Sequence, residues 1–250
     1  MNPAEYEALR AVEDRHWWFV SLRREITRAL EGRARAGGRW LDAGSGTGGL
    51  LAALERTRGL SGFGLEWSAD GIALAAARGL RRLARGSASE LPFSAASFDV
   101  ITSIDVLCHR GVAKREALSE THRCLAPRGI LILQVPAFEW LRGEHDDAVW
   151  TDRRFGRSEI RRMVETAGLT VREIFYRVSF LFPAAAVRRL LSRRRTGGAD
   201  PPPRSEVRPA APGMNAALGL VMSAESLLSA AGLRLPFGLS VFCVAQKIER

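Results

Sequence analysis

The sequence predicts an α/β fold whose doubly wound, mostly parallel sheet carries helices on both faces. Short apolar runs of strand length alternate with helical segments along most of the chain. One of these runs, R-W-L-D-A at 39–43, leads into the glycine-rich turn G-S-G-T-G-G, and a helical segment follows the turn. Strands that alternate with helices favour a parallel sheet between two helical layers. We therefore expect a three-layer α/β/α arrangement.

Six segments have the composition of strands. Each is a short, largely apolar run, and the runs at 97–104 and 130–135 are apolar enough for strands buried on both faces. In chain order the expected strands are 39–43, 61–66, 97–104, 130–135, 171–180 and 240–246.

Helical segments separate these strands. In chain order they are 3–36, 50–58, 69–78, 114–125 and 157–167. The fourth of them stops at P-R-G, residues 127–129, which is a turn signal. The first is expected to form an N-terminal helical cap, and it contains the aromatic cluster H-W-W-F at 16–19.

The whole chain is expected to form a single domain, residues 1–250. Its parts are the N-terminal cap (1–36), a core (37–180 and 236–250) and a helical insertion before the last strand (181–235). Within the insertion, residues 192–213 are rich in Arg, Pro and Gly and are expected to be a mobile linker between two apolar helices. The second of these helices, 214–233, is long enough to span a membrane, but it carries Glu225 and is rich in Ala, Gly and Ser, which argues against a span.

The composition is that of a soluble globular protein, with 46% apolar and 26% charged residues among 250. No apolar stretch follows a basic start, so we expect no secretory signal. The three cysteines, Cys108, Cys124 and Cys243, form neither a metal-ligand spacing nor a disulfide framework, which favours a cytoplasmic location. The formal charge of +10 comes from a chain in which only Lys114 and Lys247 are lysines. This bias towards Arg reflects composition more than an acidic partner, so nucleic acid is not the favoured ligand.

The glycine turn predicts a nucleotide site. A strand, a glycine-rich turn and a helix place backbone N–H groups and a helix N-terminus at the carboxyl edge of a sheet. Gly44, Gly46 and Gly49 formally match a dinucleotide fingerprint, but Asp42 stands at the mouth of the turn. A carboxylate at about 4 Å from a phosphate charge, at an effective dielectric constant near 20, costs roughly 4 kcal/mol. The cationic end of a nucleoside such as S-adenosylmethionine (SAM), which has an ammonium, a sulfonium and no phosphate, would instead be attracted.

Glu66 ends the second expected strand, 22 residues beyond Gly44. A carboxylate at this place accepts hydrogen bonds from both ribose hydroxyls. Since NAD enzymes use the same device, Glu66 predicts a ribose and does not by itself distinguish SAM from NAD.

Four linked segments between residues 39 and 136 resemble the ordered motifs of class I SAM-dependent methyltransferases, in a bacterial subgroup of the type 11/12 kind. They are L-D-A-G-S-G-T-G, then G-L-E-W-S, then S-E-L-P-F-S-A-A-S-F-D-V-I, then L-A-P-R-G-I-L-I-L-Q-V-P. The resemblance implies SAM as the cofactor and a seven-stranded sheet whose last strand, 240–246, is reversed. It implies that Gly44, Gly46 and Gly48 approach the methionine part and that Glu66 holds the ribose. The expected cofactor-binding residues are Asp42, Gly44, Ser45, Gly46, Gly48, Glu66, Trp67, Ser87, Ala88 and Asp105.

The chain departs from the family pattern at Ser87. Relatives often carry an acidic residue there, before the x-x-x-L-P segment, and it contacts the adenine amino group. In this sequence, G-S-A-S-E-L-P, the hydroxyl of Ser87 or the backbone of Ala88 would take that role.

Three residues are candidates for a general base. Methyl transfer needs a base only if the acceptor carries a proton at neutral pH. His145, in E-H-D-D at 144–147, is flanked by carboxylates and is the preferred candidate, although an exposed loop with a scattered histidine explains it equally well. His109 and Asp105 are alternatives, and Asp105 would otherwise cap the following helix. No second histidine stands at ligand spacing beside the acids, so no metal is expected.

The acceptor is expected to be a small molecule, such as a secondary metabolite or a lipid-linked glycan. Trp17 and Trp18, with His145, are expected to wall its pocket if the N-terminal segment acts as a lid, and otherwise the two rings pack in the core. An N-terminal H-W-W-F paired with E-H-D resembles a bacterial subgroup of small-molecule methyltransferases. The segment 181–213 would touch an anionic membrane, pair with a second copy of the chain, or roof the pocket.

Two other functions stay open at this point. RNA or protein methylation is favoured by the positive charge, but the chain shows no RNA-binding module and no N/D-P-P-Y/F signature. Intact cofactor motifs are equally compatible with a SAM-binding scaffold or cyclase that does not methylate. An NAD-dependent oxidoreductase is the least favoured interpretation, because of Asp42.

Overall fold

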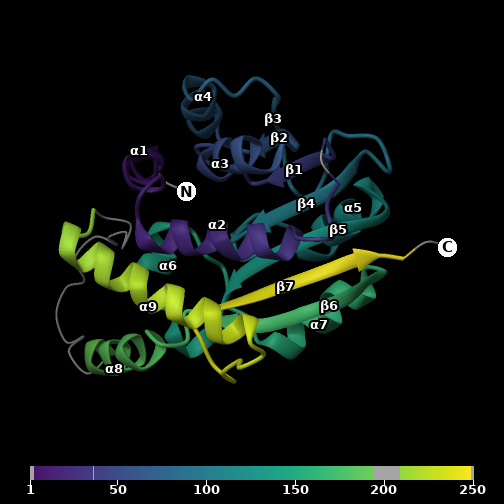
Figure 1. Cartoon of the computed structure of the whole chain (residues 1–250). Coiled ribbons are helices and arrows are strands. Elements are labelled where there is room, and N and C mark those ends of the chain that lie inside the picture. The colour runs from purple at the N-terminus through teal and green to yellow at the C-terminus, as the bar shows by residue number, and fades with distance from the viewer. Residues whose placement is uncertain (1–2, 36, 194–208, 249–250) are drawn as a thin grey trace.

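The computed structural model describes residues 3–35, 37–193 and 209–248, and its centre is a seven-stranded sheet (Figure 1). The strand order is β3-β2-β1-β4-β5-β7-β6, and β7 runs antiparallel to both of its neighbours while the other pairs are parallel. The strands are β1 (Arg39–Ala43), β2 (Ser61–Glu66), β3 (Leu83–Arg85), β4 (Phe98–Ile104), β5 (Leu125–Pro136), β6 (Leu169–Arg177) and β7 (Ser240–Lys247). The predicted sheet with a reversed last strand is confirmed. The short β3 has no apolar run of its own and was missed.

The strand register decides where functional side chains meet. Along β1 and β2, Ala43 lies opposite Leu65, and Glu66 lies opposite Arg85 of β3. Along β4 and β5, Ile104 lies opposite Gln134. The segments that follow β1, β2 and β4 therefore all begin at one edge of the sheet.

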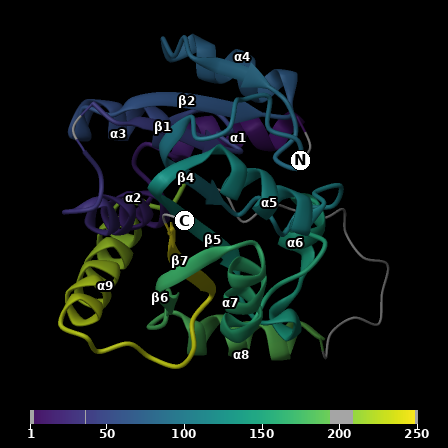
Figure 2. The same cartoon turned by 90° about the vertical axis from the view of Figure 1, so that its right-hand side faces the viewer.

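Helices cover both faces of the sheet (Figure 2). One face buries Leu118 of α5 (Lys114–Cys124) and Ile160 of α7 (Arg157–Thr166). The other buries Ile26 of α2 (Trp17–Leu30) and Leu51 of α3 (Gly49–Arg58), with the ring of Trp40 beneath them. Helix α4 (Ala69–Ala77) connects β2 to β3. The three-layer arrangement is thus built by the 3.6-residue apolar periodicity of each helix.

The N-terminal segment differs from its prediction as one helical stretch. It forms α1 (Pro3–Val12) and α2, and the chain turns between them at residues 13–16. His16 caps α2, because its Nδ1 accepts a hydrogen bond from the Trp18 N–H at 3.4 Å. The aromatic cluster therefore starts a helix instead of lying inside one, and α2 already ends at Leu30.

Three other boundaries were also wrong. The segment expected as a loop around His145 contains a short helix, α6 (Glu144–Ala148), after the 3-10 turn η1 (Glu139–Leu141). Strand β5 begins at Leu125, directly after α5, because Leu125 already pairs with Phe98 of β4; the register then shifts, and pairing resumes at Ile130. Strand β6 ends at Arg177, three residues before the expected end at 180.

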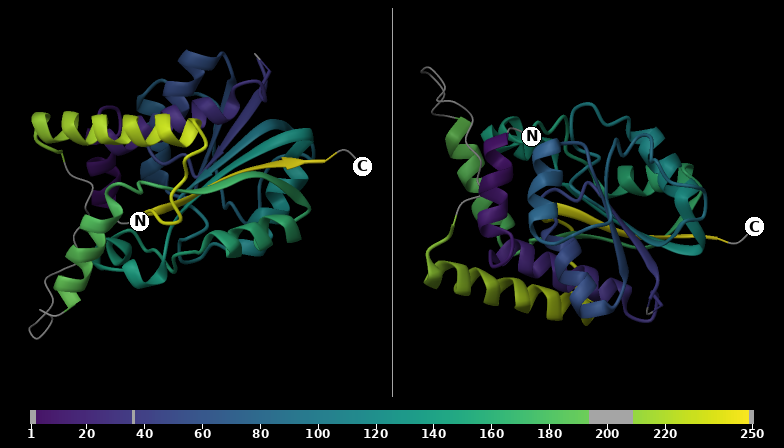
Figure 3. Two further views of the ribbon diagram at one scale, coloured as in Figure 1. Left: turned by 60° about the horizontal axis from the view of Figure 1, so that its bottom comes forward. Right: turned by 90° about the horizontal axis from the view of Figure 1, so that it is seen from above.

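The insertion between β6 and β7 contains the two expected helices, α8 (Phe182–Arg193) and α9 (Pro212–Ala230). Most of the expected linker, residues 194–208, lies outside the described part of the chain. Helix α9 lies along α2 (Figure 3), where Arg24 donates to Ser223 Oγ at 2.8 Å and Arg28 donates to the Ser226 carbonyl at 2.9 Å. Within the described ranges, no helix has both the length and the apolar character needed to cross a bilayer.

Candidate active site at the sheet edge

The glycine turn after β1 adopts a conformation that side chains would block. Gly44, Gly46 and Gly48 have φ values of 97°, 54° and 80°, in the left-handed region that favours glycine. A Cβ atom on Gly44 would lie 2.2 Å from Val106 Cγ2, and one on Gly48 would lie 2.4 Å from Leu80 Cδ1. The N–H groups of Gly44 and Ser45 donate to the Leu65 carbonyl at 2.8 and 2.9 Å, which fixes the turn against β2.

Glu66 joins this turn to two other elements. Its Oε2 accepts the Gly46 N–H at 2.9 Å, and its Oε1 accepts the Ser68 N–H at 2.9 Å and the Tyr6 hydroxyl at 3.0 Å. The carboxylate is only 8% exposed. Burial, and then the neighbouring Glu66 charge, raise the pKa of Tyr6. Tyr6 was not among the predicted site residues, because it is 60 positions away on α1 and no local pattern marks it.

Helix α1 lies over the glycine turn. Leu9 Cδ2 is 3.5 Å from the place that a Cβ on Gly46 would occupy. Just after α1, Glu13 accepts hydrogen bonds from Thr47 Oγ1 and from the guanidinium of Arg78. The same guanidinium reaches Asp14 at 3.0 Å. These contacts fasten the end of α1 to the N-terminus of α3 and to α4.

Asp42 is buried in the sheet and faces α2 and α3. Its Oδ1 accepts the Thr102 hydroxyl at 2.7 Å, and Thr102 Oγ1 accepts the Trp40 indole N–H at 2.9 Å. Burial raises the pKa of Asp42 to about 7; the Thr102 bond opposes this shift, and the nearby charges of Glu66 and Glu13 add to it. A cation brought next to these carboxyl groups would favour the ionised form of Asp42.

Asp105 follows β4 at the same edge. Its Oδ2 accepts the Gln134 side-chain N–H at 3.1 Å, while its Oδ1 is shielded from solvent and has no hydrogen-bond partner among the described residues. Burial raises the pKa of Asp105 to about 6. The alternative role as a helix cap is wrong, because the next helix, α5, begins only at Lys114 and Ala113 is its N-cap.

His109 lies in the turn after β4, where its backbone pairs with Thr151. Its Nδ1 is shielded from solvent and has no hydrogen-bond partner within the described part of the chain. Burial lowers the pKa of its imidazole.

His145 lies on α6, and burial lowers its pKa, so the ring is neutral near pH 7. The carboxylate of Glu5, on α1, opposes this shift, which places α1 near His145 as well as over the glycine turn. The two acids that follow His145 are bound by arginines. Asp146 accepts from Arg154 at 2.9 and 3.0 Å, and Asp147 lies 3.5 Å from Arg142.

The other predicted cofactor residues lie near the same strand ends. Trp67 follows Glu66 and its side chain is 71% exposed. Ser87 Oγ accepts the Ser89 N–H at 3.1 Å, and Ala88 packs against the core. Ser45 Oγ is buried, and the structure shows no partner for it among the residues described.

Trp17 and Trp18 begin α2. The Trp17 N–H donates to Asn215 of α9 at 2.9 Å, and the Trp18 ring packs edge-on against Phe19 with centroids 4.8 Å apart. Their role as pocket walls stays a prediction. Over the described residues, no three His, Cys, Asp or Glu side chains come together as metal ligands.

A family model described as a methyltransferase domain matches residues 15–174, which is more than half of the chain. The chain belongs to this family. The family match, together with structures of the same fold that contain SAM or S-adenosylhomocysteine, identifies SAM as the cofactor of this methyltransferase. A search of curated protein sequences gives no match.

Solved structures share the fold at low sequence identity. One comes from the complex between the Haloferax volcanii Trm112 methyltransferase activator and a proposed methyltransferase, with 21% identity, 99% of this chain and 95% of that chain covered, and a TM-score of 0.64. Another is phosphoethanolamine N-methyltransferase 2 of Haemonchus contortus, with phosphomonomethylethanolamine and S-adenosylhomocysteine bound. It has 17% identity, 100% and 59% coverage, and a TM-score of 0.65. The [4+2]-cyclase SpnF matches with 21% identity, 91% and 81% coverage, and a TM-score of 0.58.

The residues of the methyltransferase at the sheet edge are chemically suited to SAM. Three acidic side chains, Asp42, Glu66 and Asp105, come from adjacent strand ends, and the oxygen of Asp105 that lacks a partner can accept a hydrogen bond. The glycine turn packs closely against Val106 and Leu80, so Cβ atoms on Gly44 and Gly48 would not fit. Among the described residues, the hydrogen bonds given above for these three carboxylates come from hydroxyl, amide and backbone N–H groups and not from a basic side chain.

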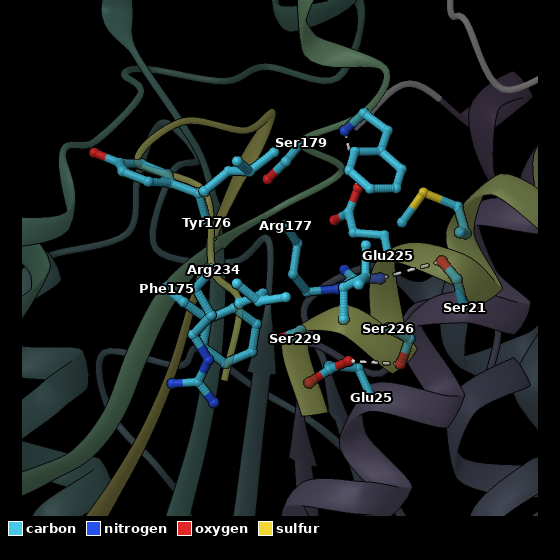
Figure 4. Close-up of a pocket in the computed structure, with 15 residues that line it drawn as sticks. Ser21, Glu25, Phe175, Tyr176, Arg177, Ser179, Glu225, Ser226, Ser229 and Arg234 are labelled. Atoms are coloured by element: carbon cyan, nitrogen blue, oxygen red, sulfur yellow. Dashed lines mark hydrogen bonds between the residues drawn. The ribbon is translucent and has the colours of Figure 1, made fainter. Parts of the chain in front are cut away.

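A cavity of about 270 Å³ lies beyond this edge, between α2, β6 and α9 (Figure 4). Buried Arg177 and Glu25 border it, together with Glu225 and the hydroxyl of Ser229, which has no hydrogen-bond partner among the residues that the structure describes. Phe175, Met222, Leu228, Leu233 and Leu235 supply its apolar lining. The sequence analysis missed this cavity, because its walls come from segments about 150 to 200 residues apart.

Replacing Tyr6 with Phe tests how α1 is held over the site. Tyr6→Phe removes the bond to Glu66 and should loosen α1, since a buried hydrogen bond to a charged group contributes about 1.5–3 kcal/mol. Hydrogen–deuterium exchange should become faster in residues 3–12 and stay unchanged in β4 and β5. The other tyrosine provides the control: Tyr176 accepts the Arg157 N–H far along the chain, so Tyr176→Phe should leave exchange in α1 unaltered. Equal exchange of α1 in the two variants would contradict this account.

Proposed function

We propose that this methyltransferase methylates a small-molecule acceptor at the edge formed by the carboxyl ends of β1, β2 and β4. The observation that carries the proposal is the negative charge of the carboxylates at this edge. Asp42, Glu66 and Asp105 all lie near the glycine turn, and they favour a ligand with cationic groups.

In this proposal the chain's residues hold the cofactor and exclude water. Bound SAM supplies a methyl group on a positively charged sulfur. Asp42 favours the ammonium end, and Glu66, with about one lone-pair site left beside its three bonds from the protein, accepts from a ribose hydroxyl. Helix α1, through Tyr6 and Leu9, covers the glycine turn and separates the site from solvent. Alignment and desolvation of this kind contribute up to about 7–11 kcal/mol to lowering a bimolecular barrier.

The acceptor side of the proposal rests on aromatic rings beyond the end of β5. The Phe138 ring stacks on Tyr176 with centroids 4.9 Å apart and meets Phe182 of α8 at 5.5 Å. Trp140 and Phe237 extend this cluster. Rings and the 270 Å³ cavity suit a small, partly apolar molecule such as a secondary metabolite or a lipid-linked glycan.

Two alternative functions differ from this proposal in whether, and with which acceptor, S-adenosylhomocysteine is released. A scaffold or cyclase, the activity named for SpnF, would bind SAM without releasing S-adenosylhomocysteine. An RNA or protein methyltransferase would release it only with a macromolecular acceptor. Measuring S-adenosylhomocysteine release with a panel of small hydroxyl and amine compounds, with mixed RNA and with protein therefore decides among the three.

The pH dependence of SAM binding tests the role of Asp42. With the pKa of Asp42 near 7 before binding, a cation that needs the carboxylate must displace its proton at lower pH. SAM affinity measured by calorimetry should therefore fall as the pH drops from 7 to 5.5, by up to about tenfold per pH unit. Above pH 7 the affinity should level off.

Two variants control this measurement. Asp42→Asn should bind SAM at least about tenfold more weakly at pH 7.5 and should show a flatter pH profile, since its amide has no proton to lose. Asp99→Asn removes a carboxylate at the opposite end of the sheet, where Asp99 accepts the Arg39 N–H, and should keep the wild-type profile. A flat pH profile of the wild-type protein, or binding of NADH instead of SAM, would contradict the proposed role of Asp42 in SAM binding.

His145 is the proposed general base. The imidazole is neutral at pH 7 because burial lowers its pKa, so it can accept a proton. His145→Ala should lower turnover of a proton-bearing acceptor by about 10²–10⁴-fold while SAM affinity is retained. His122→Ala, on α5 beside Gly168, is the control and should keep turnover. Unchanged turnover in His145→Ala would move the role to His109, which the same assay tests with His109→Ala.

We also propose that α8 touches an anionic membrane surface. Val187, Leu190 and Leu191 expose 52–56% of their surface on this helix, next to Arg188. Leu190→Asp with Leu191→Asp should then abolish cosedimentation with vesicles that contain phosphatidylglycerol. If the wild-type protein does not cosediment but light scattering shows a dimer that the double variant lacks, the helix pairs two copies of the chain instead.

A further inference from the structure

The backbone of Asp105 is held in a conformation that few residues with side chains adopt. Its φ is 54°, in the left-handed region, which is unfavourable for a residue with a Cβ. The Asp105 N–H donates to the Gln134 carbonyl at 2.8 Å, and the Asp105 carbonyl accepts the Cys108 thiol at 3.1 Å. The strand pair β4–β5 thus holds this carboxylate at the end of β4.

The two carboxylate oxygens of Asp105 have different surroundings. Oδ2 accepts the Gln134 side-chain N–H at 3.1 Å. Oδ1 is shielded from solvent and lacks a partner among the residues described. A buried acceptor left without a donor is unfavourable, so Oδ1 is suited to an N–H or O–H group of a bound molecule.

The orientation of Gln134 is set from the other side. Gln134 is fully buried, and its Oε1 accepts a hydrogen bond from the guanidinium of Arg177. A guanidinium can only donate, so the Gln134 carbonyl oxygen must face Arg177 and its NH₂ group must face Asp105. Reversing the amide would place a donor against Arg177 and an acceptor against a carboxylate.

Arg177 is anchored at the cavity behind the site. It is 3% exposed at the end of β6, and its Nη2 donates to Ser21 Oγ of α2 at 3.1 Å (Figure 4). Its charge is balanced by Glu25 of α2 and Glu225 of α9. The insertion helix α9 and the sheet edge are therefore linked through one buried guanidinium.

We propose that Arg177 and Gln134 are positioning residues that keep Asp105 ionised and its Oδ1 directed at a donor N–H or O–H group of the cofactor or the acceptor. The pair acts through Asp105 and does not itself touch the ligand. That the cofactor or the acceptor donates to Oδ1 rests on the proposed function, but the effect of Arg177 on the ionisation of Asp105 can be measured without any ligand.

The charged and titratable groups around Asp105 come from three elements. Arg177 on β6 and Arg154, which follows α6 and is paired with Asp146, both lower the pKa of Asp105, and burial raises it to about 6. The Cys108 thiol lies in the same turn. Removal of Arg177 takes away one of the two cations and frees the Gln134 amide to rotate.

The test uses the titration of Asp105 in the full-length protein, followed by NMR of labelled aspartate carboxyl carbons. Arg177→Met should raise the midpoint of Asp105 by about one pH unit or more, a tenfold change in its ionisation equilibrium. Arg234→Met is the matched control, because Arg234 borders the same cavity but pairs with Glu173 and stacks over Phe175. It should leave the midpoint where it is.

Two further variants distinguish the loss of the Arg177 charge from misfolding as the cause of a shifted midpoint. Arg177→Lys keeps a charge and should show a smaller shift of the midpoint than Arg177→Met. In Arg177→Ala, added guanidinium chloride at millimolar concentration should enter beside the existing cavity and restore the midpoint. An unmoved midpoint in Arg177→Met, or an equal shift in Arg234→Met, overturns the proposal.

Calorimetry with S-adenosylhomocysteine identifies the source of the donor. If the donor belongs to the cofactor, Arg177→Met should bind S-adenosylhomocysteine more weakly than Arg234→Met does at pH 6.5. If it belongs to the acceptor, the affinities should agree and kcat/KM for the acceptor should fall instead. Failure of the wild-type protein to bind S-adenosylhomocysteine would contradict the proposed function alone, because the titration of Asp105 needs no ligand.

Discussion

The arrangement of the site depends on the hydrogen bonds to one carboxylate, that of Glu66. Its two oxygens accept from the glycine turn after β1, from the first turn of α4 and from Tyr6 on α1. Each of these segments has free N–H or O–H groups that burial would leave unsatisfied, and a single acceptor with about four lone-pair sites satisfies all three. The turn, the crossover and the N-terminal helix are thereby fixed relative to the same strand end.

This concentration of acids has an electrostatic consequence. Burial raises the pKa values of Asp42 and Asp105 to about 7 and about 6. Asp42 is on β1, next to the strand of Glu66, and Asp105 follows β4, the neighbour of β1 on its other side. The basic residues of this arginine-rich chain pair elsewhere, as Arg78 does with Glu13 and Arg154 with Asp146. Despite a formal charge of +10, the edge of the sheet is therefore locally acidic, and the net charge says little about what binds there.

The insertion is connected to the catalytic edge by polar contacts as well as by packing. Helix α9 lies on α2, and both border the cavity that Arg177 closes. From Arg177 the hydrogen bonds run through Gln134 to Asp105. Helices α2 and α9, outside the parallel core, thus lie beside a guanidinium that is connected to the sheet edge by hydrogen bonds, because a buried guanidinium must find acceptors wherever they are available.

The sequence alone determined most strands, the glycine turn and the family, because each of them depends on residues that are contiguous in the sequence. Apolar runs set the strands within a few residues, and G-S-G-T-G with Asp42 and Glu66 indicated the cofactor edge. Local patterns did not reveal β3, which pairs three residues with β2, or the short α6 around His145. Tyr6, Gln134 and Arg177 were also missed, because their roles come from partners 29 to 156 positions away. Only the tertiary structure decides such contacts, because a buried polar group binds the partner that packing brings close to it. The spacing of residues along the sequence does not predict which partner that is.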